Sequence, residues 1–193
     1  MIVNEVAFSW TIEELRVALL LCGYVDELSI FGVTAFEDLD SEEADFGMRG
    51  LQSRGLLVVE ADQAFVADLV RDVARCACEP ESTGLLFGSS EDVVDVASFA
   101  YAEGKLLRAT FTSPGVVAGT ITEGELVDGI FALLVNASLS DVAQWSLALR
   151  IQPVDRPLLE VLVGQQGLGL IEDEQSVPAS EAEVRSALAR VLN

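Results

Sequence analysis

Apolar residues recur at helical spacing after Thr11, near the start of the chain. Leu15 and Leu19 fall on one face of the predicted helix and belong to a wide apolar stripe. Thr11 and Glu14 have the spacing of a capping box, in which each side chain accepts a hydrogen bond from the other residue's backbone N–H. Gly23 is typical of a helix end. The sequence therefore predicts a central helix between Thr11 and Gly23.

Two more helices are predicted before Pro80. Ser41 has the side chain of a helix cap, and the acidic residues after it favour the positive end of a helix that stops at Gly55. A further apolar stripe indicates a third helix from about residue 63 to 78. Short strands are predicted at residues 2–9 and 56–59. This part of the chain is thus expected to be mainly helical.

The apolar spacing changes from about 3.6 to about 2 after Pro80, and this change indicates strands. Residues 107–112 alternate between apolar and polar side chains, which predicts a sheet with one dry face and one wet face. Glu103 and Gly104 supply the chemistry of a tight turn. We expect an antiparallel meander formed by residues 85–87, 93–101, 105–112 and 116–121.

A helix is predicted to follow the meander, over residues 123–135. Thr122 and Glu125 have capping-box spacing, and the helix has an apolar face that is expected to cover one side of the sheet. The last part of the chain is predicted to contain four elements: a strand at 145–151, a helix at 155–164, a strand at 168–172 and a final helix capped by Ser180.

These elements predict an α+β fold class. We expect an antiparallel β-meander packed on helices, with an N-terminal helical segment that is similar to a winged helix. The length of 193 residues suits a single domain over 1–193. Within it, residues 1–80 are expected to form a helical sub-lobe and residues 81–193 a sub-lobe that contains the sheet.

The net charge of the chain indicates which kinds of molecule it can bind. The sequence has 32 acidic and 11 basic residues, a net charge of −21, yet 51% of it is apolar, so it can bury a core. The arginines are scattered, and an acidic surface repels the phosphate backbone of nucleic acids. We expect a protein partner with helical or basic character, and no nucleic acid.

Patterns that carry catalysis or bind metals are incomplete. The chain has no histidine, which removes the commonest general base and metal ligand. Cys76 and Cys78 lie two apart on a predicted helix and have no second pair to complete a zinc site. The glycine-rich run at residues 164–169 lacks the spacing of a phosphate-binding loop and is expected to be a helix end and turn. We therefore predict no enzyme, no catalytic residue, no metal site and no cofactor.

An acidic turn is the candidate partner-binding site. Asp38, Asp40 and Glu42 resemble the start of a calcium loop, but Glu43 and Arg49 stand where such a loop needs glycine and a bidentate acid. A helix-capping turn explains the pattern instead. Because exposed carboxylates steer a basic partner, we expect these four acidic residues to contribute to partner binding beside an exposed apolar patch.

The start of the chain lacks the basic and apolar stretches of a signal peptide, and no apolar run approaches the length of a membrane span. Three cysteines are an odd number and too few for a disulfide framework. The sequence therefore predicts a cytoplasmic protein that does not bind a membrane.

The order of the predicted elements and four short stretches in residues 10–135 match the pattern of a known family. The stretches are Leu51-Gln-Ser-Arg54-Gly55-Leu56, Cys78-Glu79-Pro80, Ala102-Glu103-Gly104-Lys105 and Thr122-Glu123. In these features residues 10–135 are similar to the EspG family of ESX (type VII) secretion-associated proteins. Members of that family are cytosolic adaptors that hold the helical tips of secreted PE–PPE protein pairs. The resemblance implies a non-enzymatic adaptor or chaperone for secreted helical substrates.

Two other functions fit parts of the pattern. A winged-helix transcriptional regulator also begins with two helices and a short strand, but its recognition helix would be residues 41–53, whose first turn is acidic and therefore of the wrong sign for DNA. An acidic immunity or inhibitor protein could neutralise a basic toxin by charge complementarity.

Overall fold

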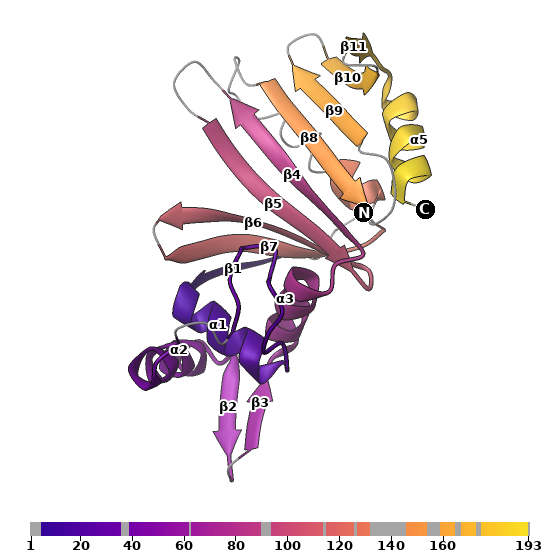
Figure 1. Cartoon of the computed structure of the whole chain (residues 1–193). Helices are drawn as coiled ribbons and strands as arrows, with labels where there is room; N and C mark the ends of the chain where they lie inside the picture. The colour runs from indigo at the N-terminus through magenta and orange to yellow at the C-terminus, as the bar shows by residue number, and fades with distance from the viewer. Residues whose placement is uncertain are drawn as a thin grey trace. The chain divides into compact units, whose positions relative to one another are not determined.

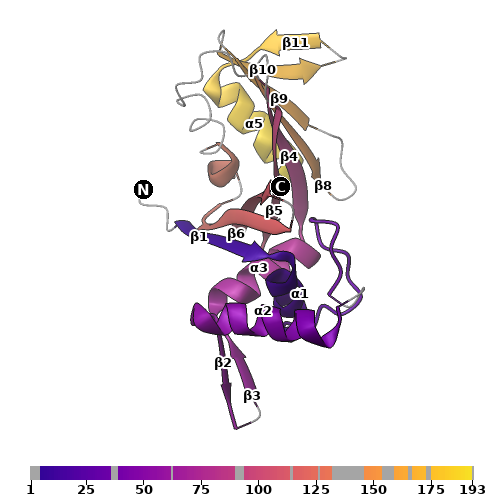
Figure 2. The ribbon, with the colours of Figure 1, turned by 90° about the vertical axis from the view of Figure 1, so that its left-hand side faces the viewer.

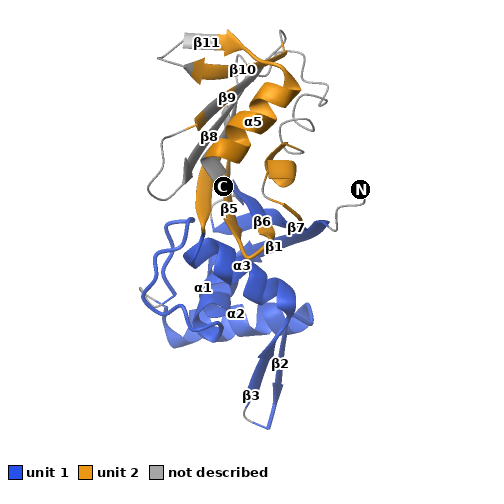
Figure 3. Cartoon of the chain, turned by 90° about the vertical axis from the view of Figure 1, so that its right-hand side faces the viewer, with its two compact units in different colours: residues 1–80, 107–122 blue, residues 81–106, 123–193 orange. Residues whose placement is uncertain are grey.

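A computed structural model describes residues 5–35, 39–61, 63–89, 94–113, 115–125, 127–131, 146–153, 159–164, 167–172 and 175–192. The chain forms two compact units (Figure 3). Unit 1 comprises residues 1–80 and 107–122, and unit 2 comprises residues 81–106 and 123–193. The single domain expected from the sequence stays a prediction.

Unit 1 combines helices with the strands β1, β7 and β6, which lie in this order (Figure 1). β1 and β7 pair antiparallel, with Glu5 opposite Thr122 and Thr11 opposite Val116. The elements are β1 (Glu5–Thr11), α1 (Ile12–Leu21), α2 (Ser41–Ser53), β2 (Leu57–Glu60), β3 (Gln63–Val66), α3 (Asp68–Cys78), most of β6 (Lys105–Ser113) and β7 (Val116–Glu123).

The caps of α1 confirm the sequence prediction. Thr11 and Glu14 form a capping box, and Gly23 follows the helix with a φ of 92°. The buried apolar side chains of unit 1 come from β1, α1, α2, β2, α3, β6 and β7 and from Ala35. The largest that are nearly inaccessible to solvent are Trp10, Leu15, Leu19, Leu51, Leu57 and Leu107. The apolar stripe read from the sequence is therefore the core side of α1.

The third helix is shorter than predicted. Residues 63–66 do not begin α3; they form β3, which pairs antiparallel with β2 and places Gln63 opposite Glu60. Ala61 makes the turn possible with a φ of 48°, a backbone conformation that the sequence signals only weakly because it is uncommon outside glycine. The helix starts at Asp68, and its buried face includes Val70 and Val73.

Unit 2 contains a run of strands in the order β5-β4-β8-β9-β10-β11. The successive pairs in this run are antiparallel. The elements are β4 (Ser82–Ser89), β5 (Val94–Ala102), β8 (Ser146–Pro153), β9 (Leu159–Gly164), β10 (Gly167–Glu172), β11 (Gln175–Pro178) and α5 (Glu181–Leu192). Antiparallel strands with separate helices confirm the α+β class.

The core of unit 2 confirms that a helix covers the sheet after the meander. Residues 127–131 are helical, and Ile130 and Phe131 are buried in a cluster with Phe99 and Leu106. The predicted cap at Thr122 is wrong, because Thr122 lies inside β7 and the chain continues extended to Glu123. The rest of the predicted helix, residues 132–135, lies outside the described residues.

The C-terminal part of the chain contains more strand than predicted. The predicted helix at 155–164 is wrong over 159–164, which form β9. In the glycine-rich run, Gly164 ends β9 and lies opposite Gly167, the first residue of β10, so the predicted helix end is a strand end. Alternation is weak in Leu159–Gly164 because the strand is nearly all apolar, and such a run reads equally as a helix. The cap at Ser180 is confirmed: its Oγ accepts a hydrogen bond from Glu183 N–H at 3.3 Å.

Candidate partner-binding surface

The acidic turn predicted from the sequence forms the N-terminus of α2. Asp40 is the cap: its Oδ1 accepts hydrogen bonds from the N–H groups of Glu42 at 2.8 Å and Glu43 at 2.9 Å. Glu43 completes a capping box, because its Oε2 accepts from Asp40 N–H at 3.3 Å. The predicted cap at Ser41 is wrong by one position, since Ser41 is the first helical residue. Asp38 lies outside the described residues.

These contacts give the acidic residues different tasks. Asp40 and Glu43 satisfy backbone N–H groups that a helix start leaves unpaired, so both carboxylates stabilise α2. Glu42 is exposed, and its carboxylate accepts no hydrogen bond from the described residues of this turn. Among the three predicted partner-binding residues that the structure describes, Glu42 is therefore the one whose carboxylate is available to meet a partner.

The outward side of α2 carries a large apolar side chain. Phe46 is 52% exposed, and Glu42, Asp45 and Arg49 around it are exposed as well. Residues three and four apart on a helix are neighbours on its surface, so Phe46 lies beside Glu42 and Arg49. We call these four residues the α2 face.

The sequence carries a signal for the α2 face in addition to the acidic turn. The inward stripe of α2 contains Met48 and Leu51, and Leu51 is fully buried. Phe46 lies two residues before Met48, which places it about 200° away around the helix. A large aromatic residue opposite the buried stripe of an amphipathic helix indicates a contact surface.

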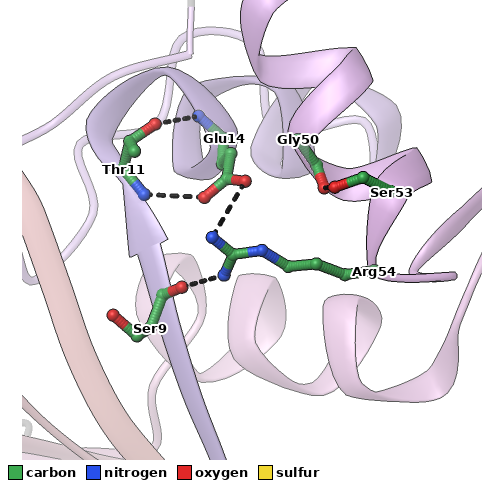
Figure 4. Close-up of polar contacts among 6 residues, drawn as sticks. All are labelled: Ser9, Thr11, Glu14, Gly50, Ser53 and Arg54. Carbon is green, nitrogen blue, oxygen red and sulfur yellow. Dashed lines mark hydrogen bonds and ion pairs between the residues drawn. The ribbon is translucent and has the colours of Figure 1, made fainter.

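An ion pair holds α2 in place (Figure 4). Glu14 in α1 is only 2% exposed, and its Oε1 lies 3.4 Å from Nη2 of Arg54, the residue that follows α2. The other Glu14 oxygen accepts from Thr11 N–H at 2.8 Å, and Arg54 Nη1 donates to the backbone carbonyl oxygen of Ser9. The ends of β1, α1 and α2 are thereby joined through two side chains.

Two glycines bring α2 close to α1. A Cβ at Gly47 would lie 2.5 Å from the backbone oxygen of Glu13 and 2.8 Å from Val17 Cγ2. A Cβ at Gly50 would lie 2.1 Å from Glu14 Oε1. Both distances are too short for real atoms, so the helices approach at these positions only because no side chain is present. The α2 face is thus presented from a closely packed pair of helices.

The cysteines have the character of unreactive thiols. Cys76 is buried, while Cys22 and Cys78 are half-buried. Burial raises the pKa of Cys22, and burial followed by the charges of Glu27 and Glu79 raises the pKa of Cys78 to about 12. A thiol with a raised pKa holds little thiolate at neutral pH and is a poor nucleophile. Within the described ranges, no group of three His, Cys, Asp or Glu side chains is arranged to bind a metal ion.

The phenol of Tyr24 gives a pH-dependent prediction. Burial, and then the hydrogen bond from its hydroxyl to Glu79 Oε2 at 3.1 Å, raises its pKa from 10.0 to about 12. Folding favours the neutral phenol, so the associated stability is present below pH 10 and is lost as pH rises towards 12. We expect the difference in tyrosinate absorbance between the wild type and Tyr24→Phe to titrate near pH 12. A midpoint near 10 would contradict the predicted environment of Tyr24.

Among the helices that the structure describes, none is both long and apolar enough to cross a membrane.

Comparisons with known proteins show a similarity of fold. No protein-family model matches the chain, and no curated protein matches it either. The chain is similar to the solved structure of the Mycobacterium tuberculosis type VII secretion system chaperone EspG5 in complex with a PE25–PPE41 dimer. The alignment has a TM-score of 0.61 at 10% sequence identity and covers 97% of this chain and 96% of the matched chain. At this identity the likeness shows a shared fold.

Proposed function

We propose that this protein is a non-enzymatic, acidic adaptor or chaperone of the cytoplasm that binds a basic, helical segment of a secreted protein. The α2 face carries this proposal, because it presents an exposed aromatic side chain between carboxylates on a rigidly held helix. An apolar centre supplies affinity when it is removed from water, and a charged rim selects the sign of the partner. The fold shared with a secretion chaperone supports the class of function.

The acidic turn is part of this proposed site, with its residues in separate roles. Glu42 steers the partner, whereas Asp40 and Glu43 keep the first turn of α2 formed. Asp38 precedes that turn and is proposed to add to the steering charge. A helical partner with an apolar stripe flanked by lysine or arginine fits such a surface, since its stripe covers Phe46 while its cations meet the carboxylates.

The regulator alternative is less well supported. The exposed side of α2 would be the reading surface of a winged helix, and it contains Glu42 and Asp45 against Arg49. Phosphate and base contacts on DNA need donors and positive charge, which these carboxylates oppose. The immunity-protein alternative uses the same acidic surface and differs only in the identity of the basic partner.

Capture of a partner from a cell lysate, followed by mass spectrometry and binding kinetics, tests the proposal. Exchanging Glu42 and Asp45 together for lysine is expected to lower the association rate roughly tenfold at low salt, and the effect should fade at high salt because ions screen the attraction. Asp40 is left unchanged in this variant, since its loss would cost about 0.5–2 kcal/mol of helix stability.

Two further variants separate charge from apolar contact. Phe46→Ser is expected to speed dissociation roughly tenfold with little change in the association rate. Glu5→Lys is the control, because Glu5 is exposed on β1 and its exchange reverses one charge away from α2, the same change per residue as in the α2 charge variant. Equal kinetics for the wild type and both α2 variants would remove the α2 face from the mechanism. Turnover of a captured small molecule would overturn the adaptor proposal itself.

A further inference from the structure

The hairpin formed by β2 and β3 exposes apolar side chains on both of its faces. Residues opposite each other in an antiparallel pair share a face, so Val58 and Phe65 lie on one side, and Val59 and Ala64 on the other. Val58 is 45% exposed, Val59 44% and Phe65 53%. Within unit 1 the hairpin extends away from the helices (Figures 1 and 2). Among the described residues of β2 and β3, only Leu57 at the base is fully buried. An isolated two-stranded sheet of this kind gains stability from a further strand.

The hydrogen bonds at the base of the hairpin show which backbone groups point outward. Ala67 N–H donates to Leu56 O at 2.9 Å, whereas the carbonyl oxygen of Val66 accepts from Arg71 Nη1 at 2.6 Å. Val66 therefore belongs to the residues that direct N–H and C=O away from the partner strand. Residues with outward backbone groups alternate along a strand, so Ala64 is the next such residue on β3. Leu57 lies opposite Val66 and Val59 lies opposite Ala64, so the N–H and C=O groups of these two residues point outward on β2.

The two edges of the hairpin consequently differ. Arg71, which also pairs with Asp68, occupies the edge of β3 at Val66. Across the part of the chain that the structure describes, no other element bonds to the outward groups of Val59 on β2. An unpaired edge with apolar residues on both faces is the arrangement that accepts an added strand.

The negative charge near the β2 edge indicates what kind of strand can pair with it. Glu60 ends β2 on the same face as Val58, and the whole chain carries a net charge of −21. A second copy of this protein would bring like charges together at this edge, which is unfavourable. A strand that alternates apolar and basic residues would cover Val59 with its apolar side, and its cations would then lie on the other face, where Glu60 is.

We propose that the outer edge of β2 binds an extended segment of a partner protein, in which apolar residues alternate with lysine or arginine, by strand addition. This site is separate from the α2 face and does not depend on the function proposed for it. Backbone hydrogen bonds to Val59 supply the register, and the apolar side of the strand covers Val59. On the other face the aliphatic stems of the lysine or arginine side chains lie over Val58 and Phe65 while their charged ends approach Glu60.

A fluorescein-labelled peptide of alternating lysine and valine is the probe, titrated with the full chain by fluorescence anisotropy at physiological salt. We expect a Kd below about 100 μM, since a short added strand binds weakly but measurably. A peptide of the same composition with its lysines and valines in two blocks, an alternating glutamate–valine peptide, and the alternating lysine–valine peptide with methylated backbone nitrogens are each expected to bind at least about tenfold more weakly.

Proline variants at the two edges form a matched pair. Val59→Pro removes the outward N–H of β2 and leaves the bonds between β2 and β3 in place, so it should weaken probe binding about tenfold. Ala64→Pro makes the same change at the edge of β3 and should leave binding unchanged. Phe65→Ser leaves every backbone donor intact and should also weaken probe binding. It replaces Val59→Pro as the test if circular dichroism shows that the proline variant does not fold.

Several outcomes would overturn the proposal. These are no binding of the alternating lysine–valine peptide, equal binding of the block peptide, and equal effects of the two proline variants. The double variant Glu42→Lys/Asp45→Lys should bind the probe within about twofold of the wild type, because charges on the α2 face are screened from the β2 edge at physiological salt. Loss of binding in that variant alone would assign the probe to the α2 face and reject the β2 edge.

Discussion

Glu14→Ala is expected to lower the free energy of unfolding by about 3 kcal/mol. The variant removes the acceptor for Thr11 N–H and leaves Arg54 without its carboxylate partner. Breaking a fully buried ion pair costs about 3–5 kcal/mol, but Arg54 is 43% exposed, so water recovers part of that loss. Chemical denaturation followed by circular dichroism measures the difference.

Glu13→Ala is the matched control for this variant. Glu13 lies in the first turn of the same helix, so its removal changes the charge near the helix dipole in the same way. Its loss should cost under about 1 kcal/mol, because it is not the capping-box residue. Glu14→Gln should fall between the two, since its amide oxygen can still accept from Thr11 but carries no charge. Equal losses at positions 13 and 14 would show that the ion pair contributes nothing.

Gly47→Ala is expected to destabilise the protein by about 1–3 kcal/mol, although alanine is ordinarily the better helix former by about 1 kcal/mol. The added Cβ would meet the backbone of Glu13, which cannot move without shifting α1. Gln52→Ala, on the exposed side of the same helix, should change stability by no more than about 0.5 kcal/mol and serves as the control. A gain in stability for Gly47→Ala would mean that α1 and α2 are not in close contact.

A double-mutant cycle extends this test to Gly50. The Cβ added by Gly50→Ala would overlap Glu14 Oε1, the end of a side chain that is held by Thr11 and Arg54. Gly50→Ala should therefore be less destabilising in the Glu14→Ala background than in the wild type, with a coupling of about 1 kcal/mol or more. Additive effects would show that the two positions do not share space.

Much of unit 1 and of the meander could be predicted because the signals are local. The capping boxes at Thr11 and Ser180 join residues three apart, and the turn at Glu103 and Gly104 needs only the conformations of two residues. Segments without such local signals are predicted wrongly as helix. β3 and β9 are short apolar runs, and a run of that length does not distinguish a strand from a helix until its partner strand is known.

The sequence by itself determined the α+β class, the helix caps at Thr11 and Ser180 and the net charge of −21. Only the tertiary structure decided how the surface is used. It separated Asp40 and Glu43, which cap α2, from Glu42, which stays available, and it left Phe46 and the β2 edge exposed. It also joined Glu14 to Arg54, residues far apart in the chain. Such outcomes depend on which distant segments pack together, and that choice minimises the free energy of the whole chain rather than of any local stretch.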